Sequence, residues 1–215
     1  YMGKPRDVMT LAHELGHAFH SWAMREMPYR ETRYPMGLAE TASTFAETVV
    51  RHYLLRTAKT PAAKLAILWE EVTSIPRFAI NIPVRYAFEK AFYEGRSERQ
   101  FTPDDFRELM SKTWLDWHGE GMSAANDMFW ATKLHFYITN PSFYNFPYIF
   151  GYLFSQRIYA ERERRGSEFF SFYTDLLCDT GRMPVEALVK KHFDEDLQDT
   201  RFWDASFGIM NAYLH

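Results

Sequence analysis

The stretch that decides the fold is Asp7-Val8-Met9-Thr10-Leu11-Ala12-His13-Glu14-Leu15-Gly16-His17-Ala18-Phe19-His20. Asp7 is typical of the residue that caps the start of a helix, and the apolar residues after it recur at helical spacing. The spacing predicts a helix from about Val8 to Met27, with an apolar stripe along one side. The stripe comprises Val8, Leu11, Ala12, Leu15, Phe19 and Trp22.

His13, Glu14 and His17 form an H-E-x-x-H pattern within this predicted helix. Two histidines four residues apart lie one turn from each other on the same face, so both rings can reach one divalent metal ion. The glutamate beside them is close enough to take a proton from a water molecule at that metal. The pattern predicts a metal site for hydrolysis, whereas a merely solvated polar face is the simpler alternative.

A catalytic zinc site needs a third protein ligand and one open position. His20 lies about 10 Å along the helix axis from His13, which is too far for both to bind the same ion. A second helix is predicted to start near Gly37, and Glu40 lies on its polar side, opposite its apolar stripe. We therefore expect Glu40 to be the third ligand, so that two packed helices close one site.

Glu47 lies two turns after Glu40 on the same polar side. It could orient a ligand histidine or hold Arg51. It could equally be an ordinary surface carboxylate that pairs with Arg51 at i+4.

These two segments resemble oligoendopeptidase F and its thimet-oligopeptidase-like relatives, which are gluzincin metallopeptidases. The resemblance rests on residues 13–20, residues 39–47 and the aromatic stretch Phe143-Tyr144-Asn145-Phe146-Pro147-Tyr148-Ile149-Phe150-Gly151-Tyr152-Leu153. It implies one Zn2+ ion per chain, held by His13, His17 and Glu40, with Glu14 as general base. It also implies short peptides as substrates, cut at internal bonds. Family members are much longer, so the chain is expected to match their C-terminal part only and to lack the N-terminal part of the same polypeptide.

The same resemblance implies that aromatic side chains stabilise the oxyanion that forms during peptide hydrolysis. The role carries over best to Tyr152, in the Gly151-Tyr152-Leu153 element, and less closely to Tyr148, Tyr144 and His135. For each, the alternative is a half-buried aromatic residue without a catalytic role.

The rest of the chain also reads as helical, so the expected fold is all-α, a zincin-type domain spanning residues 1–215. A long helical stretch from Pro61 must be kinked or divided at Pro76 and Pro83, because each proline removes a backbone donor. Further helices are predicted over about 103–117, 145–165, 168–177, 184–192 and 201–213.

Composition excludes several classes of protein. A net charge of -3 and a pI near 6.3 argue against a nucleic-acid-binding surface. No apolar run is long enough for a membrane span, and a single cysteine, Cys178, suits a reducing compartment, so a cytoplasmic location is expected. Two alternatives to an endopeptidase stay open: a zinc carboxypeptidase on a related scaffold, and a metal-binding fragment that is inactive without its N-terminal part. The same ligands would also accept cobalt or manganese.

Overall fold

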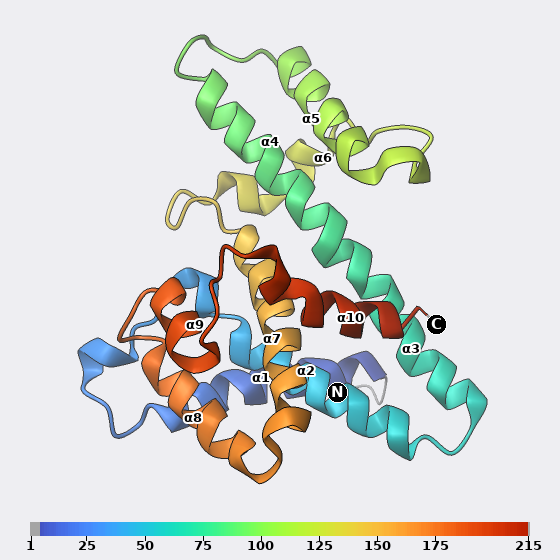
Figure 1. The fold of residues 1–215 in the computed structure, drawn as a ribbon. Coiled ribbons are helices and arrows are strands. Elements are labelled where there is room, and N and C mark those ends of the chain that lie inside the picture. Colours follow the sequence, from blue (N-terminus) through green and yellow to red (C-terminus); the bar gives the residue numbers. More distant parts are fainter. Residues whose placement is uncertain (1–4, 215) are drawn as a thin grey trace. The chain divides into compact units, whose positions relative to one another are not determined.

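A computed structural model describes residues 5–214, and within that range the chain forms helices and loops without any strand (Figure 1). This confirms the all-α prediction. The chain divides into two compact units: residues up to Ser74 together with residues from Phe150 onward, and Ile75–Ile149. None of the described helices combines the length and the apolar character needed to cross a membrane.

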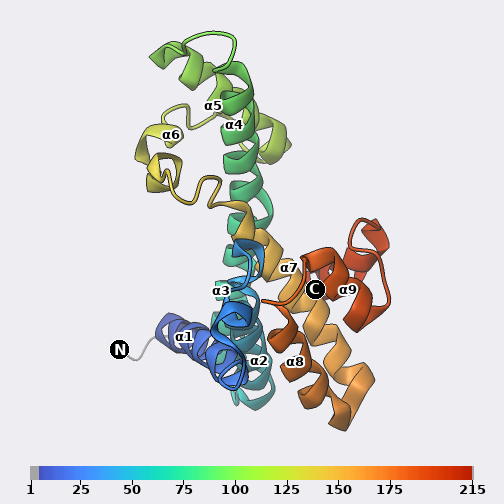
Figure 2. The ribbon, with the colours of Figure 1, turned by 90° about the vertical axis from the view of Figure 1, so that its left-hand side faces the viewer.

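The first unit contains the predicted metal-binding segments. Its helices are α1 (Pro5–Ala23), α2 (Thr41–Thr57), α8 (Phe169–Asp179), α9 (Val185–Phe193), α10 (Asp204–Ala212) and most of α3 (Pro61–Pro76) and α7 (Phe146–Arg165). Figures 1 and 2 both show α1 and α2 side by side. The hydrophobic core of this unit is built from α2, α7, α8 and α9, and its fully buried residues include Leu38, Ala42, Phe154, Ile158, Leu176, Leu177, Leu188 and Val189.

The packing face of α1 differs from the predicted apolar stripe. Leu11, Leu15 and Trp22 are 54%, 57% and 48% exposed in the described structure. The contact with α2 forms on the adjacent face, where Gly16 lies directly against the backbone of Ala42. The expectation that the largest apolar residues mark the buried side of this helix was wrong, because small residues allow the closer approach of two backbones.

Three helix boundaries also differ from the prediction. Helix α1 already includes Pro5, so Asp7 lies within its first turn and does not cap it. The first helix ends at Ala23 rather than near Met27, and the second begins at Thr41 rather than near Gly37. A short 3-10 turn at Met36–Leu38 precedes it, and Glu40 is the residue immediately before the first turn of α2.

The second unit is a helical hairpin with attached short turns. It contains α4 (Ile82–Gly95), α5 (Pro103–His118) and the short α6 (Phe129–Thr132). Pro76 is the last residue of α3, a π-helical segment follows directly over Arg77–Asn81, and Pro83 lies in the first turn of α4. The helical stretch therefore continues without a break, and the two prolines flank a change of helix type. A separate core fills this unit, made of Val84, Phe88, Met110, Trp114 and Phe129.

Candidate metal centre

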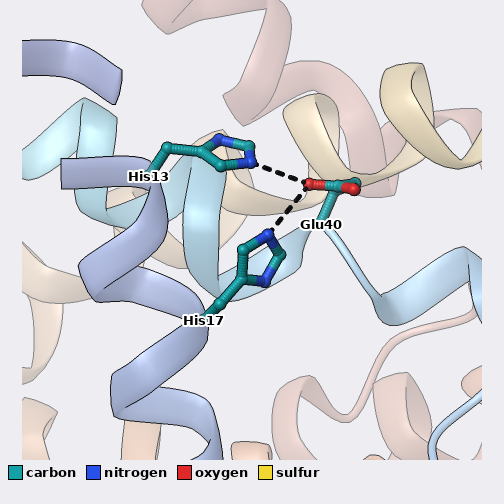
Figure 3. A group of neighbouring side chains, drawn as sticks. All are labelled: His13, His17 and Glu40. Carbon is teal, nitrogen blue, oxygen red and sulfur yellow. Dashed lines mark ion pairs between the residues drawn. The ribbon is translucent and has the colours of Figure 1, made fainter. Parts of the chain in front are cut away.

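The structure brings together the three residues predicted to bind metal. His13 and His17 lie one turn apart on α1, and their rings meet edge to face with centroids 4.9 Å apart. Both point toward the same carboxylate oxygen of Glu40, as Figure 3 shows. Nε2 of His13 is 3.3 Å from Glu40 Oε2, and Nε2 of His17 is 3.6 Å from it.

These separations suit a tetrahedral zinc ion. Two donor atoms that each lie about 2.0–2.1 Å from one tetrahedral ion are about 3.3–3.4 Å apart. One ligand atom from each of His13, His17 and Glu40 lies within 4.8 Å of the others. Two imidazoles and one carboxylate are also a donor set that zinc uses in catalytic sites, where the fourth position stays open. The residues present therefore fit a zinc ion.

Two glycines allow this geometry. A Cβ atom on Gly16 would lie 2.4 Å from the carbonyl oxygen of Ala42, so only glycine lets α1 approach the start of α2 this closely. A Cβ atom on Gly151 of α7 would lie 2.8 Å from Cβ of Glu40. Gly151 also accepts a hydrogen bond at its carbonyl from the Thr44 hydroxyl, at 3.0 Å. The Glu40 backbone is thus held between α2 and α7.

The Glu40 side chain is held as well. The hydroxyl of Ser43 donates to Glu40 Oε2 at 2.9 Å. Burial by itself raises the pKa of Glu40, but hydrogen bonds from His13 and Ser43 and the nearby histidine charges lower it overall. The carboxylate is therefore ionised near neutral pH and available to a cation.

The Glu47 side chain contacts both of the partners predicted for it, His13 and Arg51. Nδ1 of His13 donates to Glu47 Oε1 at 2.6 Å, and Oε2 of Glu47 is 3.8 Å from Nη2 of Arg51. A carboxylate on Nδ1 fixes the orientation of the ring and directs Nε2 toward Glu40. Hydrogen bonds with Glu40 and Glu47 raise the pKa of His13 to about 10, although burial opposes this. Metal binding must therefore displace a proton from Nε2.

His20 lies away from this cluster, as predicted. It is fully buried, its ring stacks on Tyr34, and its Nε2 is 2.9 Å from the hydroxyl of Thr180. That hydroxyl donates to the Leu177 carbonyl, so its oxygen accepts from the Nε2 proton of His20. Burial lowers the pKa of His20 to about 4. His20 is thus a neutral core residue.

The residues predicted to stabilise the oxyanion are divided between the two units. Tyr152 belongs to the first unit, is 3% exposed and donates its hydroxyl proton to Glu71 Oε1 at 2.6 Å. Burial and the Glu71 charge raise the pKa of Tyr152. His135 and Tyr148 belong to the second unit, where their ring centroids are 5.9 Å apart. Tyr144 stacks edge to face on Tyr148 there.

The pair of Arg51 and Glu71 was missed by sequence reasoning. Nη2 of Arg51 is 2.8 Å from Oε2 of Glu71, and both side chains are buried. Glu71 follows Glu70 on α3 and reads as an ordinary surface carboxylate. The sequence around it contains no signal that its side chain is buried.

The model of Peptidase family M3 matches residues 3–209. The chromosomal oligoendopeptidase F of Lactococcus lactis subsp. cremoris is 26% identical over all of this chain, and the oligopeptidase PepF of Bacillus subtilis is 26% identical over 87% of it. A solved structure from Chlamydophila abortus, 22% identical, superposes over the whole chain with a TM-score of 0.83.

The chain spans about a third of the length of these relatives, from 28% of PepF to 36% of oligoendopeptidase F and of the solved structure. Within that third, the family match extends over nearly every residue, including both metal-binding segments. The chain therefore belongs to peptidase family M3.

Proposed function

We propose that this chain is the metal-bearing part of a zinc-dependent oligoendopeptidase, which hydrolyses internal bonds of short peptides. The observation that carries the proposal is the cluster of His13, His17 and Glu40, with both Nε2 atoms directed at one carboxylate oxygen. Membership of family M3 and the names of the relatives support the reaction class and the substrate class.

A zinc ion in such a site supplies Lewis acidity, which makes a water molecule more acidic and polarises the scissile carbonyl group. Glu14 is the proposed general base. Glu14 directly follows the ligand residue His13 on α1, and its side chain is exposed. In the described part of the chain it makes no hydrogen bond or ion pair, so its carboxylate can accept a proton from water and pass it to the leaving amine.

Tyr152, Tyr148 and His135 are the proposed donors to the oxyanion. A hydroxyl or imidazole donor aimed at the developing charge contributes several kcal/mol in such sites. The hydroxyl of Tyr152 donates to Glu71 in this structure, so its action on a substrate requires that this hydrogen bond be exchanged. Burial and the positive charges of Arg85 and Lys133 lower the pKa of His135, which favours its neutral form.

Metal stoichiometry tests the proposed site directly. The full chain, a Glu40→Ala variant and a control variant, Glu26→Ala, are exposed to equal zinc and freed of excess metal by gel filtration. We expect one zinc ion per chain in the wild type and in the control, whose carboxylate is at the surface on the loop after α1, and loss of zinc in Glu40→Ala. Equal zinc in Glu40→Ala, or none in folded wild type, would contradict the ligand set.

Product analysis separates the proposal from a carboxypeptidase. Mass spectrometry of peptides cut by the active enzyme gives internal fragments from an endopeptidase. Stepwise loss of C-terminal residues alone would favour the carboxypeptidase. If the chain needs the remaining polypeptide for activity, adding that part in trans restores hydrolysis, whereas a purely metal-binding module stays silent.

A further inference from the structure

A row of polar side chains, half-buried at its first member and buried at the others, leads away from His13 in the first unit. It runs from Glu47 and Arg51 on α2 to Glu71 on α3 and Tyr152 on α7. Glu47 Oε1 contacts His13, and Glu47 Oε2 faces Arg51. The two oxygens of one carboxylate are therefore divided between a ligand histidine and a buried cation.

Glu71 completes this row at its deepest point. Its side chain is 0% exposed, and it accepts hydrogen bonds from the Tyr152 hydroxyl at 2.6 Å and from Ser74 at 3.2 Å. Its Oε2 also lies 2.8 Å from Nη2 of Arg51. A buried carboxylate is expensive to remove from water unless charge and hydrogen bonds compensate for it. Here both oxygens are compensated, and three separate helices hold the group in place.

The guanidinium of Arg51 is therefore fixed from the core side. It has little freedom of its own, because the side chain is buried and ion-paired to a carboxylate that two further donors hold. Its charge lies 3.8 Å from Glu47 Oε2, close enough to favour one orientation of the Glu47 carboxylate. The orientation of that carboxylate, in turn, sets the ring orientation of His13.

We infer that Arg51 and Glu71 are positioning residues of the metal centre, acting on His13 through Glu47. The inference deepens the proposed function and rests on His13 being a metal ligand. It assigns Arg51 and Glu71 a role beyond stability, and it gives the buried Tyr152 hydroxyl a part in the same network.

A second buried ion pair provides a matched control. Nη1 of Arg157 is 2.6 Å from Oε1 of Glu161, and these two side chains are about as deeply buried as those of Arg51 and Glu71. Arg157 also pairs with Glu195, but neither of its carboxylate partners contacts a ligand histidine. Arg157→Lys and Arg51→Lys therefore remove the same guanidinium fork from similar surroundings. Only the second lies next to Glu47.

The experiment measures the zinc dissociation constant of the full chain by competition with a chelator, at equal folded fractions verified by circular dichroism. We expect Arg51→Lys to weaken zinc binding about tenfold, because the loss of a residue that orients a metal ligand commonly lowers metal affinity by at least that factor. Arg157→Lys should change zinc affinity by less than about twofold. Glu71→Gln, which keeps the shape and removes the charge, should weaken binding in the same direction and covers the case in which Arg51→Lys does not fold.

A double-variant cycle tests the route through Glu47. In a Glu47→Gln background, Arg51→Lys should cause little further loss of zinc affinity, because the carboxylate on which it acts is already gone. Wild-type affinity in both Arg51→Lys and Glu71→Gln, equal weakening by Arg157→Lys, or fully additive losses in the double variant would each overturn the inference while zinc binding by the wild type still stands. A wild type that binds no zinc would overturn the proposed function, and this inference with it.

Discussion

Glu14 and Glu40 are both glutamates near the ligand histidines, but their surroundings give them different chemistry. Glu40 is buried and bonded to Ser43, whereas the Glu14 side chain is exposed. We expect Glu14→Gln to bind zinc at the wild-type stoichiometry and to lose about 10²–10⁴-fold in peptide hydrolysis, because the amide cannot accept the proton of the attacking water. Parallel metal analysis and turnover assays of the active enzyme measure both. Hydrolysis at the wild-type rate by the zinc-loaded variant would remove Glu14 from the mechanism.

His20 gives the fold a dependence on pH. Its pKa is about 4 in the folded chain, against an ordinary value of 6.5, so between these values the unfolded chain binds the additional proton. Stability is therefore fully present above pH 6.5 and is lost as the pH falls toward 4. The shift corresponds to a loss of about 2 kcal/mol between pH 7 and pH 5.

Denaturant unfolding of the metal-free wild type and of His20→Gln at pH 7 and pH 5 measures this loss. The wild type should lose about 2 kcal/mol more than the variant over that interval. His13 contributes in the opposite sense, because its pKa is raised and its stabilisation is present at low pH and fades as the pH rises toward 10. Its contribution is common to both proteins and cancels in the comparison. An equal loss in the two proteins would show that His20 is not neutral in the folded state.

At the scale of elements, the contact between α1 and α2 depends on the absence of a side chain at Gly16. A Cβ atom there would meet backbone atoms of Ala42 and Ser43 at 2.4 and 2.6 Å, and backbone atoms cannot swing aside as a side chain end can. We expect Gly16→Ala to reduce the free energy of unfolding by about 1–3 kcal/mol and to weaken zinc binding, because the two helices carry different ligands.

Gly208 on α10 is the matched control for this substitution. A Cβ atom at Gly208 would have nothing within 4 Å, so Gly208→Ala should be neutral or stabilise the fold by up to about 1 kcal/mol. Thermal unfolding and zinc titration of the two variants test the expectation together. Equal behaviour of Gly16→Ala and Gly208→Ala would mean that α1 and α2 are farther apart than the structure places them.

The elements were largely predictable from sequence, because their signals are local. The prolines at positions 76 and 83 flank the π-helical segment that interrupts the long α-helical stretch. Thr102 caps α5: its hydroxyl accepts the Asp105 N–H, and its own N–H donates to the Asp105 carboxylate. The ligand residues were predictable for the same reason: His13 and His17 are related by one helical turn. The packing face of α1 was not predictable, because burial of Gly16 and exposure of Leu15 depend on the backbone of α2, which lies elsewhere in the chain.

At the scale of the whole molecule, no stretch of linker composition separates the two units. The boundaries fall at Ser74–Ile75, within α3, and at Ile149–Phe150, within α7. A helix that continues through a boundary keeps its ordinary pattern of residues, so sequence reasoning has no loop to detect there. The network of Arg51, Glu71 and Tyr152 escaped prediction for a related reason, since its members are brought together from three helices.

The two separate cores predict which part of the molecule zinc binding stabilises. All three ligands belong to the first unit, and the core of the second, around Phe88 and Trp114, contains none of them. Bound zinc stabilises the part of the chain that must unfold to release it. Free zinc at 100 times the dissociation constant should therefore add about 2.7 kcal/mol to the free energy of unfolding of the first unit. Native-state hydrogen exchange should therefore slow about 100-fold at the most protected amides of α1 and α2 and stay unchanged in α4 and α5. The Glu40→Ala variant, given the same zinc, should show no slowing anywhere. Equal slowing in both units of the wild type would show that they unfold as one cooperative body, so that the stability of the metal site also depends on the aromatic core of the second unit.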